Sequence, residues 1–98
     1  MTSPLVIEPE AEAEFAEAVQ WYDARHPGLG AEFARTIRAA LADIERAPLR
    51  FPIVSGTTRR AVLRRFPYAI YFVIDPEQIA VIAIFHGRRD PTRWQVRR

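Results

Sequence analysis

The residues best suited to chemistry are basic and aromatic side chains that flank apolar segments in the second half of the chain. They are Arg59, Arg60, Arg64, Arg65, His86, Arg88, Arg89, Arg93 and Trp94. A guanidinium group is planar, permanently charged and presents five donors in a fixed fork, so it suits phosphate, carboxylate and stacked aromatic partners. A cationic rim of this kind on a small domain predicts recognition of an anionic macromolecule or an acidic protein segment.

Some of these residues could also take part in phosphodiester cleavage. Histidine exchanges a proton near neutral pH, so His86 could act as a general base. Arg64, Arg88 and Arg89 could stabilise a phosphate in its transition state, and Trp94 could stack on a nucleobase. The same residues also have structural interpretations. His86 ends a predicted strand, where it could serve only as a hydrogen-bonding group, and the arginines could bind a protein partner alone.

The placement of the charges carries more information than their type. All 14 basic residues are arginine, a bias that a GC-rich genome can produce by itself. The first 47 residues hold nine acidic residues and four arginines, whereas the remaining residues hold three acidic residues and ten arginines. This asymmetry predicts an anionic partner for the second half, unless the two halves neutralise each other in the fold.

Composition excludes several classes of function. Cysteine is absent, which excludes disulfides, thiolate zinc sites and cysteine nucleophiles. His26 and His86 lie in unrelated segments and no carboxylate spacing suits a metal, so neither a metal nor another cofactor is expected. No apolar run follows a basic N-terminus, and apolar runs such as residues 69–74 are far shorter than the roughly 20 residues that span a bilayer. We therefore expect a cytoplasmic protein that makes no membrane contact.

The hydrophobic pattern predicts a single α+β domain over residues 1–98. Phe15, Ala18, Val19 and Tyr22 repeat at helical spacing, and a Pro- and Gly-containing turn separates this helix from a second one. The expected elements are a strand over residues 5–7, helices over 9–25 and 31–47, and strands over 60–64, 68–75 and 79–86. The order is β-α-α-β-β-β, with the helical hairpin packed on one face of a small, largely antiparallel sheet.

The last two predicted strands are apolar at nearly every position, so we expect them to be covered on both faces. The helical hairpin covers one face, and a partner or a second copy of the chain would cover the other. Tyr68 and Tyr71 should lie on opposite faces, because side chains alternate along a strand. Residues 49–58, with Pro52 and Gly56, are expected to form a loop.

Several segments of the chain resemble the RelE/ParE family of bacterial type II toxins. They are residues 18–22 (AVQWY), 29–33 (LGAEF), 47–52, 64–71 (RRFPYAIY) and 86–94 (HGRRDPTRW). Their order and spacing cover nearly the whole chain. The resemblance implies a small, stable, growth-inhibiting toxin that is encoded beside a labile antitoxin, whose C-terminal segment wraps around the toxin. A dimer of toxin–antitoxin heterodimers is compatible with it.

The family has two branches with different targets. RelE-like members enter the ribosome and cleave mRNA, whereas ParE-like members inhibit DNA gyrase without a catalytic site. Against the RelE-like pattern, this chain has Val62 between Arg60 and Arg64, Ala69 where an arginine is usual, and Trp94 where a catalytic tyrosine is usual.

We therefore expect a ParE-like gyrase inhibitor, with the basic residues and Trp94 binding the target or the antitoxin. In the alternative, a RelE-like endoribonuclease, His86, Arg64, Arg88 and Arg89 would be catalytic. Arg89 does match the arginine that follows the last strand in that branch. A general DNA-binding module is a third hypothesis, but the sequence predicts no helix with an arginine face to enter a groove.

Overall fold

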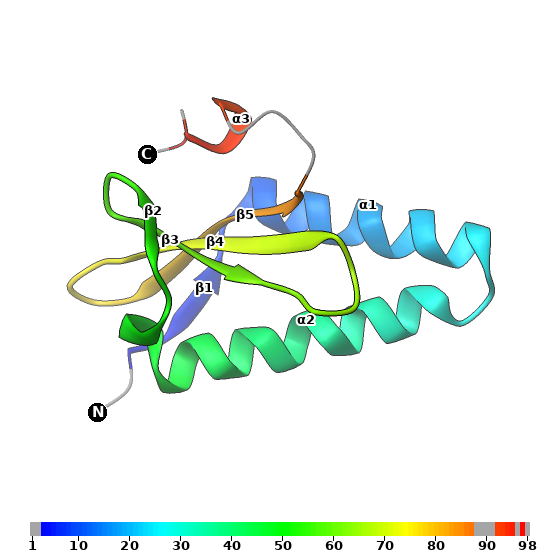
Figure 1. Ribbon diagram of the computed structural model, residues 1–98, viewed down its shortest axis with the longest axis horizontal. Helices are drawn as coiled ribbons and strands as arrows, with labels where there is room; N and C mark the ends of the chain where they lie inside the picture. Colours follow the sequence, from blue (N-terminus) through cyan, green and yellow to red (C-terminus); the bar gives the residue numbers. More distant parts are fainter. Residues whose placement is uncertain (1–2, 88–91, 96, 98) are drawn as a thin grey trace.

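A computed structural model describes residues 3–87, 92–95 and 97, without the side chains of Thr92 and Arg93. Its elements, drawn in Figure 1, are β1 (Leu5–Ile7), α1 (Pro9–Arg25), α2 (Leu29–Arg46), the short 3₁₀ helix η1 (Pro48–Arg50), β2 (Ile53–Ser55), β3 (Thr58–Val62), β4 (Tyr68–Ile74), β5 (Ile79–His86) and α3 (Thr92–Gln95). The five strands form one sheet in the order β1-β5-β4-β3-β2. β1 runs parallel to β5, and the other neighbours are antiparallel.

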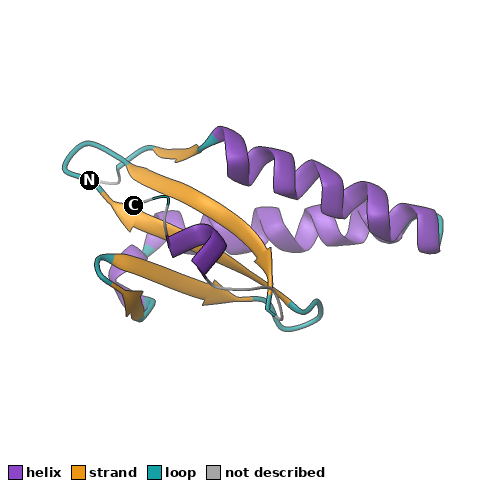
Figure 2. Cartoon of the chain, turned by 90° about the horizontal axis from the view of Figure 1, so that it is seen from above, coloured by secondary structure: helices purple, strands orange, loops and turns teal. Residues whose placement is uncertain are grey.

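The sheet has an apolar cluster on each face. Phe33 and Ile37 of α2 are fully buried against Ile70 and Phe72 of β4 on the helical face. The opposite cluster includes Tyr71 and is covered by α3, which lies above the sheet in Figure 1 while α2 lies below it. The helical hairpin extends past the sheet at the end where α1 meets α2 (Figure 2).

Local chemistry sets the ends of the two long helices. Pro9 occupies the first helical position of α1, where its missing N–H is not needed, and acidic residues follow in the first turn. α2 begins after Gly28, whose φ of 92° lies in the left-handed region that glycine tolerates. The side chain of Asp23 accepts hydrogen bonds from the backbone N–H groups of Gly28 (3.0 Å) and Gly30 (3.3 Å). One helix thereby caps the start of the next.

A bulge in β5 changes which residues face the helices. Tyr71 pairs with Ala83 and Phe72 with Val81, which leaves Ile82 as an extra residue in β5. Val81 belongs to the helical-face cluster, whereas Ile82 and Ala83 both belong to the opposite one. The bulge therefore shifts the alternation between the two halves of β5.

The predicted α+β fold is confirmed, with a helical hairpin on one face of a mostly antiparallel sheet. Tyr68 and Tyr71 do pack in opposite clusters. Three details differ from the prediction. α2 starts at Leu29, two residues early, and β3 covers 58–62, because pairing with β4 ends at Val62 opposite Ala69. The expected loop at 49–58 contains β2 and most of η1, which begins at Pro48.

Candidate functional site

Arg59 holds the chain segment before β2 in place. It lies opposite Phe72 in the β3–β4 ladder, and its guanidinium donates to the carbonyl oxygens of Phe51 (2.6 Å) and Leu49 (3.4 Å). These carbonyls belong to η1 and to the residue that follows it, so the arginine satisfies acceptors that no strand pairs. The geometry gives Arg59 a structural role.

Arg60 and Arg64 are the predicted site arginines that the structure leaves free. Both side chains are exposed, and neither side chain forms an ion pair or hydrogen bond with the described residues. Arg60 lies opposite Tyr71 and Val62 lies opposite Ala69, so these two side chains share the sheet face away from the long helices. Val62 is 66% exposed. β3 thus presents an apolar side chain beside an unpaired cation, which suits an amphipathic acidic segment.

Arg65 points toward α2 instead. Its guanidinium donates to the side chain of Glu32 at 3.2 Å, and its Cζ lies 5.5 Å from the Phe66 ring centroid. The two paired side chains are 63% and 40% exposed, so the ion pair contributes little to stability. Of the four arginines around β3, two therefore make internal contacts and two do not.

Trp94 packs inward rather than toward a partner. It is 4% exposed, and its ring stacks on Tyr71 with centroids 4.2 Å apart and planes 24° apart. In this arrangement the ring covers the sheet and presents no face to a nucleobase. Arg88 and Arg89 lie outside the described residues, as does the side chain of Arg93. Their roles in binding or catalysis stay predictions.

His86 ends β5 and borders a pocket, which we call the α1–β5 pocket. Its ring meets that of Tyr68, its partner in the β4–β5 ladder, edge-on with centroids 5.4 Å apart. The pocket has a volume of about 510 Å³ and lies between α1 and the end of β5. The aromatic and acidic side chains that line it are Glu14, Glu17, Trp21, Tyr22, Tyr68 and His86.

Tyr22 closes the inner end of this pocket. Its ring lies 5.0 Å from Phe66 and 6.0 Å from Tyr68, centroid to centroid. Burial, with a smaller contribution from Tyr68, raises the pKa of the Tyr22 phenol above its ordinary value. The phenol is therefore neutral at physiological pH and can take part in hydrogen bonds as donor or acceptor.

Sequence reasoning missed an ion pair between Glu14 and Arg97. The two guanidinium nitrogens of Arg97 donate to the two carboxylate oxygens of Glu14 at 3.1 and 2.7 Å. The hydrogen bonding that Arg97 donates to Glu14 is the main reason that the pKa of Arg97 lies above its ordinary value. The side chains are only 17% and 14% exposed. No local pattern links residues 83 positions apart, so the sequence offers no signal for this pair.

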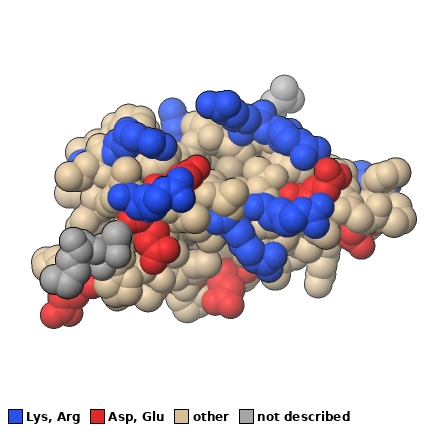
Figure 3. Space-filling view, turned by 90° about the horizontal axis from the view of Figure 1, so that it is seen from below, with Lys and Arg blue, Asp and Glu red and all other residues tan. Residues whose placement is uncertain are grey.

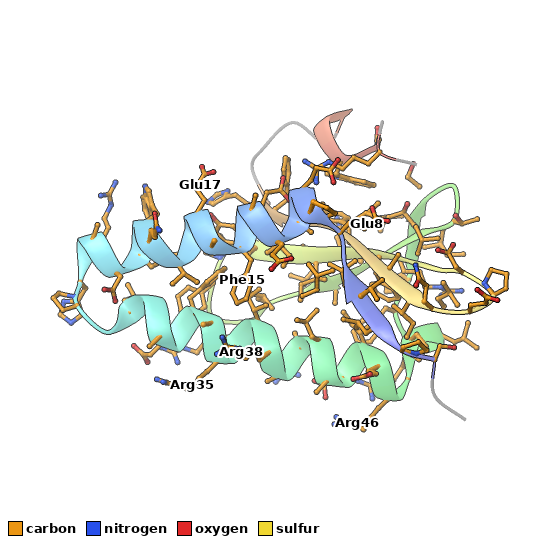
Figure 4. All side chains as sticks on the ribbon, turned by 180° about the vertical axis from the view of Figure 1, so that it is seen from behind. Glu8, Phe15, Glu17, Arg35, Arg38 and Arg46 are labelled. Carbon is orange, nitrogen blue, oxygen red and sulfur yellow. The ribbon has the colours of Figure 1, made fainter. Side chains whose placement is uncertain are left out.

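The two long helices expose different charged side chains. Figure 4 shows Arg35, Arg38 and Arg46 extending outward from α2, whereas Glu17 extends from the side of α1 that faces away from α2. Figure 3 shows arginine side chains spread over the underside of the molecule, with acidic groups between them. α2 also carries Glu32, Asp43 and Glu45, so its arginines alternate with acidic residues, and the absence of an arginine-faced groove helix stays a prediction.

The described part of the chain offers neither a metal site nor a membrane-spanning helix. No group of three or more histidine, aspartate or glutamate residues there is placed to hold a metal ion. None of the described helices combines the length and the apolar character that a membrane crossing requires.

Comparisons with known proteins identify relatives of the whole domain. Residues 5–91 match the model of the ParE toxin family of type II toxin–antitoxin (parDE) systems. The chromosomal ParDE system from P. aeruginosa contains a chain that superposes with a TM-score of 0.78 at 16% identity, covering 86% of this chain and 95% of that one. The RelBE2 toxin–antitoxin complex from Mycobacterium tuberculosis gives a TM-score of 0.59 at 18% identity, covering 88% and 99%. A comparison with curated protein sequences finds no match.

Proposed function

Because the chain belongs to the ParE toxin family of type II toxin–antitoxin systems, we propose that it inhibits DNA gyrase and that a cognate antitoxin neutralises it. The observation that carries this proposal is the family match over residues 5–91. The likeness to chains of the ParDE and RelBE2 complexes supports the fold but does not choose between gyrase and the ribosome.

The incomplete set of nuclease groups also supports a non-catalytic inhibitor. A ribonuclease of this size needs a base, a phosphate clamp and an acid for the leaving oxygen. Trp94, at the position where the RelE-like branch often has a tyrosine, has no acidic hydroxyl and is stacked on Tyr71. Val62 interrupts the basic residues of β3. The described residues thus supply fewer of these groups than a nuclease requires.

Binding of an acidic protein surface is the task that the exposed arginines fit best. The side chains of Arg60 and Arg64 have no partner among the described residues, so both can pair with carboxylates of the gyrase or of an acidic antitoxin segment. Val62 provides an apolar contact beside them. Arg88 and Arg89, which follow β5 in the sequence, are proposed to extend the same cationic surface.

The direct test is a supercoiling assay with purified gyrase and relaxed plasmid, run beside an in vitro translation assay. We expect the chain to block supercoiling, to leave translation unchanged, and to lose its effect when the antitoxin encoded beside it is added. Replacing Arg60 and Arg64 with alanine should raise the concentration for half-inhibition by roughly tenfold. Arg88→Ala with Arg89→Ala should act in the same direction.

A matched control separates target binding from a general loss of charge. Arg35→Ala with Arg38→Ala removes the same charge from exposed, unpaired positions on α2 (Figure 4). This variant should inhibit supercoiling like the unmodified chain. Equal loss of inhibition in both double variants would contradict a role for the β3 surface, and full supercoiling in the presence of the chain would contradict gyrase as the target.

The contact between His86 and Tyr68 supports a second candidate, a ribosome-dependent endoribonuclease with His86, Arg64, Arg88 and Arg89 as its catalytic groups. The imidazole is among the groups that line the α1–β5 pocket, where a ribose hydroxyl could approach it. Under this alternative, the chain would stop translation and cut mRNA on the ribosome, and His86→Ala would abolish the cuts. Cleavage that persists in His86→Ala would remove the histidine from the mechanism.

A further inference from the structure

The α1–β5 pocket is lined by no residue of β3, so it is separate from the surface of Arg60 and Val62. It lies between α1 and the end of β5, and no described residue that lines it is a lysine or an arginine. We propose that this pocket receives an arginine side chain of a protein partner. The proposal goes beyond the proposed function and does not depend on which enzyme the toxin inhibits.

The aromatic walls of the pocket suit a flat cation. Trp21 is 50% exposed, which is unusual for so large an apolar ring, and it meets Tyr22 edge-on at a centroid distance of 5.1 Å. Tyr68 and His86 form a second edge-on pair at 5.4 Å. Guanidinium stacks on aromatic faces and is more weakly hydrated than ammonium, so it loses less on entering such a site.

Two guanidinium groups of the chain itself already bind residues that line this pocket. At one end, Cζ of Arg25 lies 3.9 Å from the centroid of the Trp21 ring. At the other end, Arg97 forms its two hydrogen bonds with Glu14. The space between them offers the same two kinds of contact, an aromatic face and a carboxylate.

Glu17 supplies the carboxylate for an incoming guanidinium. It is exposed and has no ion pair or hydrogen bond with the described residues. Figure 4 shows it extending from α1 away from α2. Further along the same side, Glu14, Glu10 and Glu8 act together on the guanidinium of Arg97 and raise its pKa. A cation bound beside Glu17 would therefore be favoured by several acidic groups on one helix.

The pocket is suited to a side chain rather than to an added strand. Glu14 accepts the backbone N–H of Ile84, and Arg97 donates to the carbonyl oxygen of Ile82. These groups belong to the part of β5 that lies beyond its pairing with β1, so strand addition there would first have to break both contacts. The methylene groups of an arginine can instead pack on Ala18, Pro67 and Ile84, which line the remaining wall.

The test uses the full chain and the blocked tripeptide acetyl-Ala-Arg-Ala-amide. Chemical shifts of the backbone amides and of the two tryptophan indoles report where the peptide binds. We expect shifts at Trp21 and the end of β5, and an affinity at least roughly fivefold higher than for the matching citrulline peptide, which keeps the shape but not the charge. The matching lysine peptide should bind more weakly than the arginine peptide.

Two variants that each remove one negative charge from α1 test whether Glu17 itself binds the arginine peptide. Glu17→Gln should weaken binding roughly threefold. Glu12→Gln, an exposed position on the same helix that does not line the pocket, should leave it unchanged. Equal binding of the arginine and citrulline peptides, equal binding of the arginine and lysine peptides, or equal effects of the two variants would each overturn the proposal. Because none of these measurements involves gyrase, the proposed function can fail without affecting the result.

Discussion

The carboxylate of Glu14 and the guanidinium of Arg97 together complete the hydrogen bonding of the bulged strand β5. The carboxylate accepts the backbone N–H of Ile84 at 3.0 Å, and the guanidinium donates to the carbonyl oxygen of Ile82 at 2.8 Å. Ile82 is the extra residue of the bulge, and β1 pairs with β5 only up to Val81. The pair therefore takes the place of a longer β1 and fixes the end of the chain to the sheet.

Removing one member of this pair should be costly. Glu14→Ala leaves the N–H of Ile84 without its acceptor and the guanidinium of Arg97 without its counter-ion, in a position with little access to water. We expect the free energy of unfolding to fall by about 2–3 kcal/mol, because an unpaired buried donor keeps its desolvation cost. Urea denaturation followed by circular dichroism measures this change.

The exposed pair Arg46–Asp43 provides the comparison for Glu14→Ala. Its side chains are 70% and 44% exposed, so water already solvates both charges. Asp43→Ala should change the free energy of unfolding by less than about 0.5 kcal/mol. If the two alanine variants lost similar amounts of stability, the special role assigned to Glu14 would be refuted.

Trp94 is expected to hold α3 on the sheet. Trp94→Ala removes the ring that stacks on Tyr71 and uncovers the apolar cluster of that face. The free energy of unfolding should fall by about 3 kcal/mol or more, and binding of the dye ANS should rise as apolar surface becomes exposed. Trp94→Phe keeps an aromatic ring and should lose much less. Unchanged stability and dye binding in Trp94→Ala would mean that α3 does not cover the sheet in solution.

The elements that the sequence could predict are those marked by a pattern of neighbouring residues, such as helical spacing of apolar side chains or a continuous apolar run. α1 was predictable to its ends, because Pro9 starts it, apolar residues repeat at helical spacing, and Pro27 follows it. β4 and β5 were recognisable as two apolar runs around a short polar turn. β2 was not, because its three residues adopt strand geometry only by pairing with β3, and neighbouring Pro52 and Gly56 suggest a loop.

The parts of the candidate site that sequence could not predict depend on contacts between distant residues. A continuous apolar run such as β5 hides the bulge at Ile82, because no polar residue marks which side chains change face. Arg59 and Arg60 are adjacent and identical in type, yet one bonds backbone carbonyls and the other is free. Only the tertiary structure distinguishes a structural arginine from one available to a partner.

Gly30 is required where α1 and α2 approach each other. A Cβ at this position would lie 2.5 Å from the carbonyl oxygen of Val19 and 2.9 Å from Cβ of Asp23. Gly30→Ala should therefore push the helices apart and lower the free energy of unfolding by about 2 kcal/mol or more. Gly87→Ala is the control, since among the described residues its Cβ would meet the carbonyl oxygen of Pro67 at 3.6 Å, an ordinary contact. A stable Gly30→Ala variant with unchanged melting temperature would contradict this packing.

Tyr22 should make the stability of the protein sensitive to alkaline pH. Burial and the neighbouring Tyr68 raise the pKa of its phenol above the ordinary value of 10.0. Above about pH 10 the unfolded chain loses this proton while the folded chain retains it, so stability is fully present below that pH and declines as the pH rises through the folded pKa.

Tyr22→Phe keeps the ring but cannot titrate. The unmodified chain should therefore lose stability faster than Tyr22→Phe between about pH 9 and pH 11, with a difference in slope of at most about 1.4 kcal/mol per pH unit. Urea denaturation of both proteins across this range measures the difference, and parallel stability curves would contradict a buried, protonated Tyr22.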